Sequence, residues 1–250
     1  VLLLAGRHLE RQQFTRLCKA IENLFFCYII TREPTRTFER NFATWATDLR
    51  AVENQTQVDA FIDARINSDL ARRRSAFDFA FAELTQSRVQ KYRMRYILAK
   101  LTQYIELQAW NNAAHASLDQ YIDSNVDVEH ILPQKPTPEV RIAFDKSEQY
   151  DDYVERLGNL TLLEKTINTC VSNGFYTEKM PGYQQSNYLL TRSLVEKPHV
   201  GANTQLNRAV KDLPQFDDWN SVAIERRQSM LVELAAYVWG MPAAEDSSVE

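Results

Sequence analysis

The chain has 250 residues, of which 44% are hydrophobic and 25% are charged, a composition that excludes a wholly disordered, collagen-like or disulfide-stapled protein. The formal net charge of -4 argues against a basic nucleic-acid coat protein. The three cysteines, Cys18, Cys27 and Cys170, are too few and too scattered for a disulfide framework or a zinc site of paired cysteines, so we expect a cytoplasmic protein.

The sequence contains no targeting or membrane segment that we can recognise. No run approaches the roughly 20 apolar residues of a membrane-spanning helix, and the opening run Val1 to Ala5 lacks the basic segment of a signal peptide. We therefore expect no membrane partner. Because the first residue is a valine rather than a methionine, we also expect a longer protein of which this is the C-terminal piece.

The charge balance and the glycine and proline content of the chain both change near residue 125. Residues 1–125 hold 17 basic and 14 acidic residues, one glycine and one proline, whereas residues 126–250 hold 12 basic and 19 acidic residues, five glycines and seven prolines. Scarce glycine and proline favour continuous helices. We predict a helical bundle region over 1–125, a second domain over 126–240 and a tail over 241–250.

Apolar residues recur at spacings of three and four along the first region, as on one face of an amphipathic helix. They predict a helix from Phe14 to Tyr28 that stops before Pro34, and a second from Phe38 to Arg50. A third helix begins at Thr56 or Gln57. The next begins at Ser68 as its N-cap, and the longest runs from Val89 to Trp110.

The second region predicts short strands among proline-rich loops. The extended runs are Val126 to Leu132 and Leu160 to Leu163, and a closing helix from Trp219 should end before Gly240. The predicted fold class is therefore mainly α with a small α+β part, and we expect the end of the tail, Glu245 to Glu250, to be frayed.

Polar residues of catalytic type lie in and around these two strands. The first strand continues as Asp127-Val-Glu-His-Ile-Leu-Pro-Gln134, the second is preceded by Leu157-Gly-Asn159, and Asn168 follows nine residues after Asn159. An acidic residue beside a histidine, followed by two asparagines, resembles the ordering of the HNH, or His-Me finger, nucleases. With Lys179, Tyr183 and the closing helix, the segment looks like the C-terminal nuclease domain of GmrSD-type modification-dependent restriction enzymes, over roughly residues 85–240.

The resemblance implies a ββα-metal catalytic core wrapped by C-terminal helices, with a role for each motif residue. His130 would be the general base, since imidazole accepts a proton near neutral pH, and Asn159 would orient it by side chain or local backbone. Glu129 and Asn168 would hold one divalent cation through oxygen, a ligand set that favours Mg²⁺ or Mn²⁺.

Strand geometry leaves the ligand set open. Neighbouring residues on a regular strand point to opposite faces, so Glu129 and His130 share a site only where the strand twists, bulges or ends. Asp127 lies on the face of Glu129 and could replace or supplement it. Asn173 is the alternative to Asn168.

Four basic residues are candidates for nucleic-acid contact. Lys179 and Arg227 match basic positions of the family, which implies phosphate contact, although a solvated lysine and arginine would look the same in sequence. Arg93 and Arg95 belong to a basic cluster between Arg88 and Arg95, and Arg72 to Arg74 form a second cluster. Such clusters either steer DNA or form the solvated side of a helix.

The residues and the family resemblance together predict a metal-dependent DNA endonuclease, and the resemblance implies that it serves as the effector of a modification-dependent restriction or anti-phage system. By the same resemblance, its expected partners are double-stranded DNA, possibly modified, and an upstream NTP-binding sensor domain. The chain itself has no Gly-rich phosphate loop, so we expect no nucleotide hydrolysis in this part of the protein. Cleavage of both strands would need a homo-oligomer or repeated binding. The alternatives are a non-catalytic DNA-binding or protein-interaction module and a toxin-type nuclease that acts on RNA.

Overall fold

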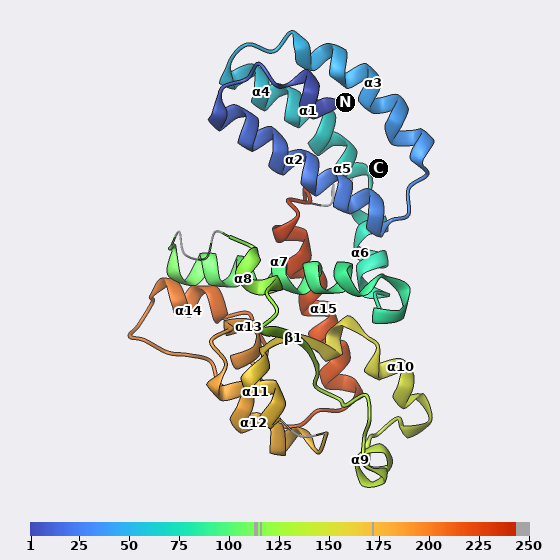
Figure 1. Ribbon diagram of the computed structural model, residues 1–250, viewed down its shortest axis with the longest axis vertical. Helices are drawn as coiled ribbons and strands as arrows, with labels where there is room; N and C mark the ends of the chain where they lie inside the picture. Colours follow the sequence, from blue (N-terminus) through green and yellow to red (C-terminus); the bar gives the residue numbers. More distant parts are fainter. Residues whose placement is uncertain (113–114, 116, 172, 244–250) are drawn as a thin grey trace, which may run out of the picture. The chain divides into compact units, whose positions relative to one another are not determined.

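The computed structural model describes residues 1–112, 115, 117–171 and 173–243. Two compact units make up the chain: unit 1 contains residues 1–82 and the C-terminal segment from 235, and unit 2 contains residues 83–234 (Figure 1). Within the described ranges, no helix has the length and apolar character needed to cross a bilayer. Because the last helix begins in unit 2 and ends in unit 1, the two units share one continuous element.

The regular elements described in unit 1 are all helices. Its elements are α1 (Leu2–Ala5), α2 (Arg11–Ile30), α3 (Thr35–Arg50), α4 (Gln55–Phe61), a π-helical continuation (Ile62–Asn67), α5 (Ser68–Arg72) and α6 (Arg74–Ala82). The predicted helices over 14–28 and 38–50 are confirmed. The core of the unit is aromatic: Phe26 of α2 stacks on Trp239, with ring centroids 3.9 Å apart, and both rings contact Phe81 of α6.

The prediction that Ser68 caps a new helix is wrong. Ser68 has helical backbone angles, φ -61° and ψ -37°, and lies in a helical stretch that already began at Gln55. Asn54 provides the N-cap instead, since its side chain accepts a hydrogen bond of 3.0 Å from the backbone N–H of Gln57. The π-helical turn keeps the chain helical through a segment whose sequence suggests a new start.

Unit 2 is built around a two-stranded antiparallel sheet. Strand β1 (Val126–His130) pairs with β2 (Leu160–Glu164) from Val126 opposite Glu164 to His130 opposite Leu160. Both predicted strands are confirmed, and β1 ends at His130 rather than Leu132. The predicted combination of a mainly helical chain with a small sheet is therefore confirmed.

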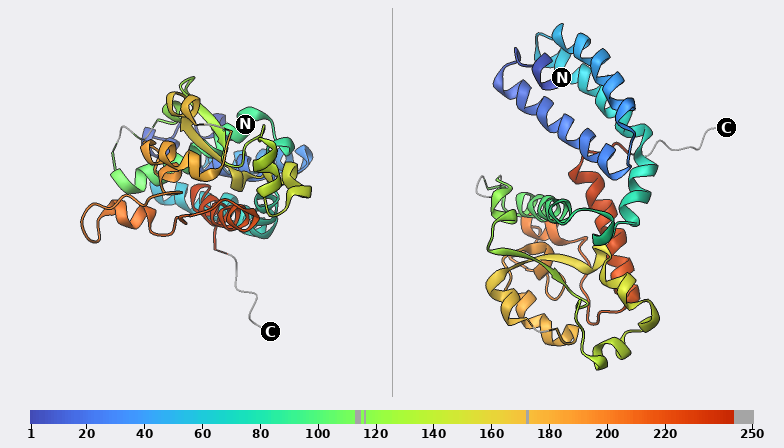
Figure 2. Two further views of the ribbon diagram at one scale, coloured as in Figure 1. Left: turned by 90° about the horizontal axis from the view of Figure 1, so that it is seen from below. Right: turned by 45° about the vertical axis from the view of Figure 1, so that its right-hand side comes forward.

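Helices cover both faces of this sheet. Helix α7 (Lys91–Trp110) lies on one side, and α11 (Lys165–Cys170) and α12 (Tyr176–Gln185) lie on the other (Figure 2). The remaining helices of the unit are α8 (Asp119–Ile122), α9 (Pro138–Ala143), α10 (Tyr150–Val154), α13 (Leu189–Arg192), α14 (Gln205–Val210) and α15 (Ser221–Val238). The long helices α7 and α15 were both predicted. Left-handed backbone at Asn111 ends α7, and Gly240, with φ +56°, follows α15.

The boundary near residue 125 does not coincide with the division into units. Residues 83–125, which composition grouped with the helical region, belong to unit 2, because α7 packs on β2, α13 and α14. Of the tail, Met241 is buried, and the fraying predicted for Glu245 to Glu250 falls on residues that lie outside the described ones.

Candidate active site

Strand β1 presents its polar side chains on two faces. The register through His130 is regular, so Asp127 and Glu129 point to one face and His130 points to the other. The strand ends at His130. The register has no bulge that would turn the imidazole toward the face of the acidic side chains, and His130 is the last residue of the strand.

Asp127 and Asn168 lie together on the first face. Asn168 is on α11, which follows β2 directly, and its Nδ2 donates a hydrogen bond of 3.2 Å to Oδ2 of Asp127. Both residues are half-buried. Two oxygen-bearing side chains are thus next to each other with access to solvent, whereas Asn173 has no described contact with either of them.

Glu129 is the most deeply held carboxylate of the strand. Its Oε1 accepts hydrogen bonds from Lys179 Nζ at 2.8 Å and from the Tyr183 hydroxyl at 2.9 Å, both from α12. Lys179 is only 1% exposed and also donates to the His130 carbonyl at 2.8 Å. Burial lowers the pKa of Lys179, and the negative charge of Glu129 partly offsets this shift. For Tyr183, burial is the larger cause and the Glu129 charge the next one, and both raise its pKa.

His130 is held by a residue far away in sequence. Its Nε2 lies 2.7 Å from Oε1 of Gln86, and the residue is 8% exposed. Burial, followed by the charge of Lys179, lowers the pKa of His130 to about 4. The imidazole is therefore neutral near pH 7, which is the form that can accept a proton.

Asn159 is buried and contacts the chain after His130, not the ring. Its Oδ1 accepts hydrogen bonds from the Leu132 backbone N–H at 2.6 Å and from the Trp219 indole at 2.9 Å. Its Nδ2 donates to the carbonyls of Leu132 and Val154, each at 3.0 Å, and its own carbonyl accepts from Ile131. All hydrogen-bonding positions of this amide are thus occupied, and of the two orienting modes expected for Asn159 the geometry fits the one through local backbone.

The expected phosphate contacts do not fit two of the four basic residues. Lys179 is buried against Glu129, and Arg227 of α15 has no exposed surface; its Nη1 donates to the carbonyls of Gly158 at 2.8 Å and Leu160 at 2.7 Å. Burial lowers the pKa of Arg227 to about 10. A cation enclosed in this way cannot reach a phosphate on the surface, and Arg227 instead fixes the backbone on both sides of Asn159.

Arg93 and Arg95 lie on the first two turns of α7 and are both half-buried. Arg95 Nη2 donates to the carbonyls of Asp123 and Val126, and so holds the chain where it enters β1. Arg93 lies against the Tyr92 ring, 5.6 Å from its centroid. Arg95 is therefore bound to the start of β1, whereas the contact described for Arg93 is with its neighbour Tyr92.

Comparison with known proteins identifies the family of this domain. Residues 71–234 match the family described as GmrSD restriction endonucleases, C-terminal domain. The chain belongs to this family. No curated protein and no solved structure gave a match. The matched range contains the whole of unit 2, so the two faces of β1 lie inside the domain of these restriction endonucleases, enzymes that cut DNA.

The side chains of this GmrSD-family domain fit a hard divalent cation in their chemistry. Asp127, Glu129 and Asn168 supply only oxygen ligands, which Mg²⁺ and Mn²⁺ prefer. Over the described part of the chain, no group of three or more histidine, cysteine, aspartate or glutamate side chains gathers as in a preformed metal cage. The pair Asp127 and Asn168 is the more accessible half of the set, because Lys179 and Tyr183 already occupy one oxygen of Glu129.

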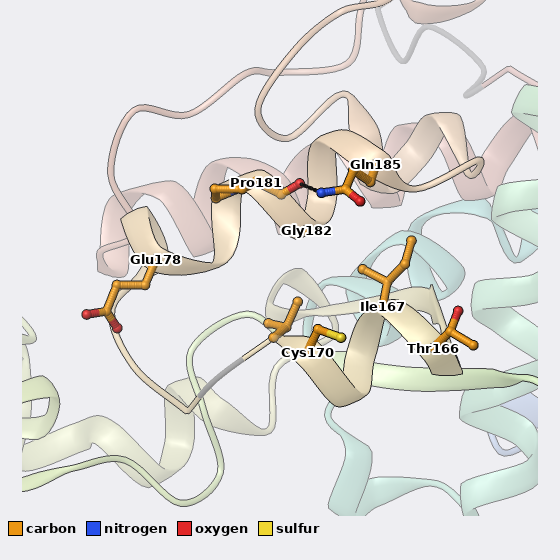
Figure 3. Close-up of a pocket in the computed structure, with 8 residues that line it drawn as sticks. Thr166, Ile167, Cys170, Glu178, Pro181, Gly182 and Gln185 are labelled. Carbon is orange, nitrogen blue, oxygen red and sulfur yellow. Dashed lines mark hydrogen bonds between the residues drawn. The ribbon is translucent and has the colours of Figure 1, made fainter.

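A groove of about 430 Å³ separates α11 from α12 but does not contain the site residues. Figure 3 shows Ile167 and Cys170 of α11 facing Pro181 and Gly182 of α12 across it. The two helices approach closely at Gly182, where a Cβ atom would lie 2.5 Å from Val171 Cγ2. This glycine allows the helix that carries Asn168 and the helix that carries Lys179 to cover the same sheet face.

Sequence reasoning missed Gln86 and Trp219 as parts of the site. Gln86 belongs to a 3₁₀ turn (Gln86–Arg88), 44 residues before His130. Trp219 entered the sequence analysis only as the start of the closing helix, whereas its indole donates to Asn159. Neither contact has a signal in local sequence, because both partners come from distant segments that only the fold brings together.

Proposed function

We propose that this domain is a metal-dependent DNA endonuclease with a ββα-metal core, formed by β1, β2 and α11. In this proposal it hydrolyses phosphodiester bonds in the cytoplasm as the effector of a modification-dependent restriction system that acts against invading DNA. The observation that supports the proposal most is the placement of His130. A neutral imidazole ends the strand whose other face carries Asp127 and Glu129, with Asn168 beside Asp127.

Each residue has a role in this chemistry. His130 accepts the proton of the attacking water, since hydroxide is the stronger nucleophile toward phosphorus. Asp127, Asn168 and the second oxygen of Glu129 would hold Mg²⁺ or Mn²⁺, which supplies charge neutralisation at the phosphate and at the departing oxygen when bound. Asn159 and Arg227 fix the backbone around His130 and do not touch substrate.

Lys179 has a different role from the one its sequence position implied. Its ammonium group neutralises Glu129 and fixes the His130 carbonyl. A buried positive charge at this place also favours the neutral imidazole over the imidazolium. Lys179 therefore keeps His130 in the form that can accept a proton.

Sensing of modified DNA and hydrolysis of a nucleotide belong, in this proposal, to an upstream domain. Arg93 is our candidate for contact with the DNA backbone, because its guanidinium is partly exposed and does not bind the strand.

Incubation of the chain with supercoiled plasmid tests the proposal. We expect Mg²⁺ or Mn²⁺ to support nicking and EDTA to abolish it. Parallel incubations with duplex DNA and single-stranded RNA separate the DNA nuclease from a toxin-type RNA nuclease. Absence of cleavage of every substrate at high protein concentration would favour a non-catalytic binding module.

A further inference from the structure

Gln86 contacts the imidazole of His130 through the only hydrogen bond described for that ring. The distance from Gln86 Oε1 to His130 Nε2 is 2.7 Å, whereas the side chain of Asn159 binds backbone and the indole of Trp219. We propose that Gln86 is the positioning residue of the general base. This inference rests on the proposed nuclease function and adds a residue that lies outside the catalytic motif.

The backbone around Gln86 is fixed on the segment that leads into β2. The Gln86 N–H donates to the Glu155 carbonyl at 2.7 Å, and the Leu157 N–H donates to the Leu84 carbonyl at 3.0 Å. Thr85 pairs with Arg156 as an isolated antiparallel bridge between these two hydrogen bonds. Residues 84–86 are therefore all paired with residues 155–157. This second segment leads directly to Asn159, so the backbone of Gln86 is fixed relative to it.

The contact decides which nitrogen of His130 takes the proton. An amide oxygen only accepts hydrogen bonds, so Nε2 of the ring must carry the hydrogen and donate it. The neutral imidazole then has its lone pair on Nδ1. No described residue bonds Nδ1, which leaves this nitrogen for the attacking water. Gln86 thus fixes both the rotation of the ring and its tautomer, as partners of this kind do for other histidines.

Kinetics with two substitutions at Gln86 test the proposal. Gln86→Met keeps the length of the side chain and removes the acceptor, so we expect kcat for plasmid nicking to fall by about 10- to 100-fold with KM changed less than about twofold. Gln86→Glu keeps an acceptor oxygen and should retain most of the activity. Gln90→Met, at an exposed glutamine in the same segment, is the matched control and should behave like the wild type.

Two kinetic results would overturn the proposal. One is a Gln86→Met protein with wild-type kcat. The other is an equal loss of kcat in Gln86→Met and Gln86→Glu, because the acceptor oxygen would then be irrelevant. Thermal unfolding of each variant shows whether a loss of activity reflects a loss of fold.

The tautomer can be measured without any cleavage. Long-range ¹H–¹⁵N NMR spectra of the metal-free chain, with His130 assigned by comparison with His130→Ala, should show Nε2 protonated in the wild type and a mixture of tautomers in Gln86→Met. A ring protonated on Nδ1 in the wild type would contradict the role of Gln86. If His130→Ala cuts DNA normally, the general-base role of His130 fails instead, while the NMR result still describes the contact.

Discussion

At the scale of single residues, Asn159 and Asn168 come from one motif but occupy opposite environments. Asn159 is buried and makes four side-chain hydrogen bonds, whereas Asn168 is half-buried and makes one. Asn159→Ala should lower the free energy of unfolding by about 3 kcal/mol, because it leaves buried backbone groups of Leu132 and Val154 without partners. Urea denaturation measures this difference.

Asn168→Ala is the matched control for that measurement. Its effect on unfolding should stay within about 0.5 kcal/mol, since the amide is partly solvated and makes a single contact, while plasmid nicking should be lost. Equal destabilisation by the two substitutions would mean that Asn159 is not the structural clamp that its hydrogen bonds indicate.

Sequence predicts the types of the site residues better than their partners. The carboxylates, the imidazole and the two asparagines were recognised from a short string and a spacing of nine. Sequence could not show that Lys179 and Arg227 are enclosed, because the burial of a cation depends on helices α12 and α15 covering the strand pair. For the same reason Gln86 had no signal, since a contact over 44 residues exists only in the fold.

At the scale of elements, the ion pair between Lys179 and Glu129 joins α12 to β1. Removal of one partner leaves the other charge buried and uncompensated, which costs more than the pair itself contributes. We expect Lys179→Met to lower the free energy of unfolding by about 3 kcal/mol. The double variant Lys179→Met/Glu129→Gln should be more stable than Lys179→Met alone.

A double-mutant cycle in chemical denaturation checks this expectation. The coupling energy should exceed about 1 kcal/mol in the direction that restores stability. Additive losses in the two single variants and the double variant would show that the charges do not interact in solution.

Glu106 joins α7 to the start of α13 and predicts a pH dependence. Its Oε1 accepts from the Leu189 N–H and its Oε2 from the Trp110 indole, both at 2.7 Å, and burial raises its pKa above the ordinary 4.5. Just above pH 4.5 the unfolded chain has lost this proton while the folded chain keeps it. The free energy of unfolding therefore falls as pH rises from 4.5 to the raised pKa.

Comparison with Glu106→Gln isolates this contribution, because glutamine has no proton to lose. The wild type should lose stability relative to the variant as pH rises through that window, in urea titrations at a series of pH values. A difference between the two proteins that is constant from pH 4.5 to pH 8 would contradict the raised pKa.

Elements with a strong apolar repeat were the ones that sequence located well. The helices α2, α3, α7 and α15 follow from apolar residues at spacings of three and four, and both strands follow from short apolar runs bounded by turn residues. Ser68 has the chemistry of an N-cap, but it is the first residue of α5 and directly follows a π-helical turn that carries the helix onward, so the predicted cap is wrong. The preference of serine for the N-cap position did not decide the structure there, because the helix that began at Gln55 continues through this residue.

At the scale of the whole molecule, the matched domain and the compact units agree at one end. The family match ends at residue 234, where unit 2 also ends, although α15 continues to Val238 in unit 1. The catalytic residues proposed here, together with Gln86, Asn159 and Arg227, all belong to unit 2. The nuclease chemistry that we propose is therefore confined to the unit that the family defines.

The central claim is that His130 is the base of a phosphodiester hydrolase, and a comparison of two histidine variants tests it most directly. His130→Ala and the control His199→Ala, at an exposed histidine of the same unit, are assayed for Mg²⁺-dependent plasmid nicking, for DNA binding and for thermal unfolding. We expect His130→Ala to lose at least about 100-fold in nicking rate, to bind DNA and unfold like the wild type, and His199→Ala to cut normally. Nicking by His130→Ala at the wild-type rate would show that His130 is not the base.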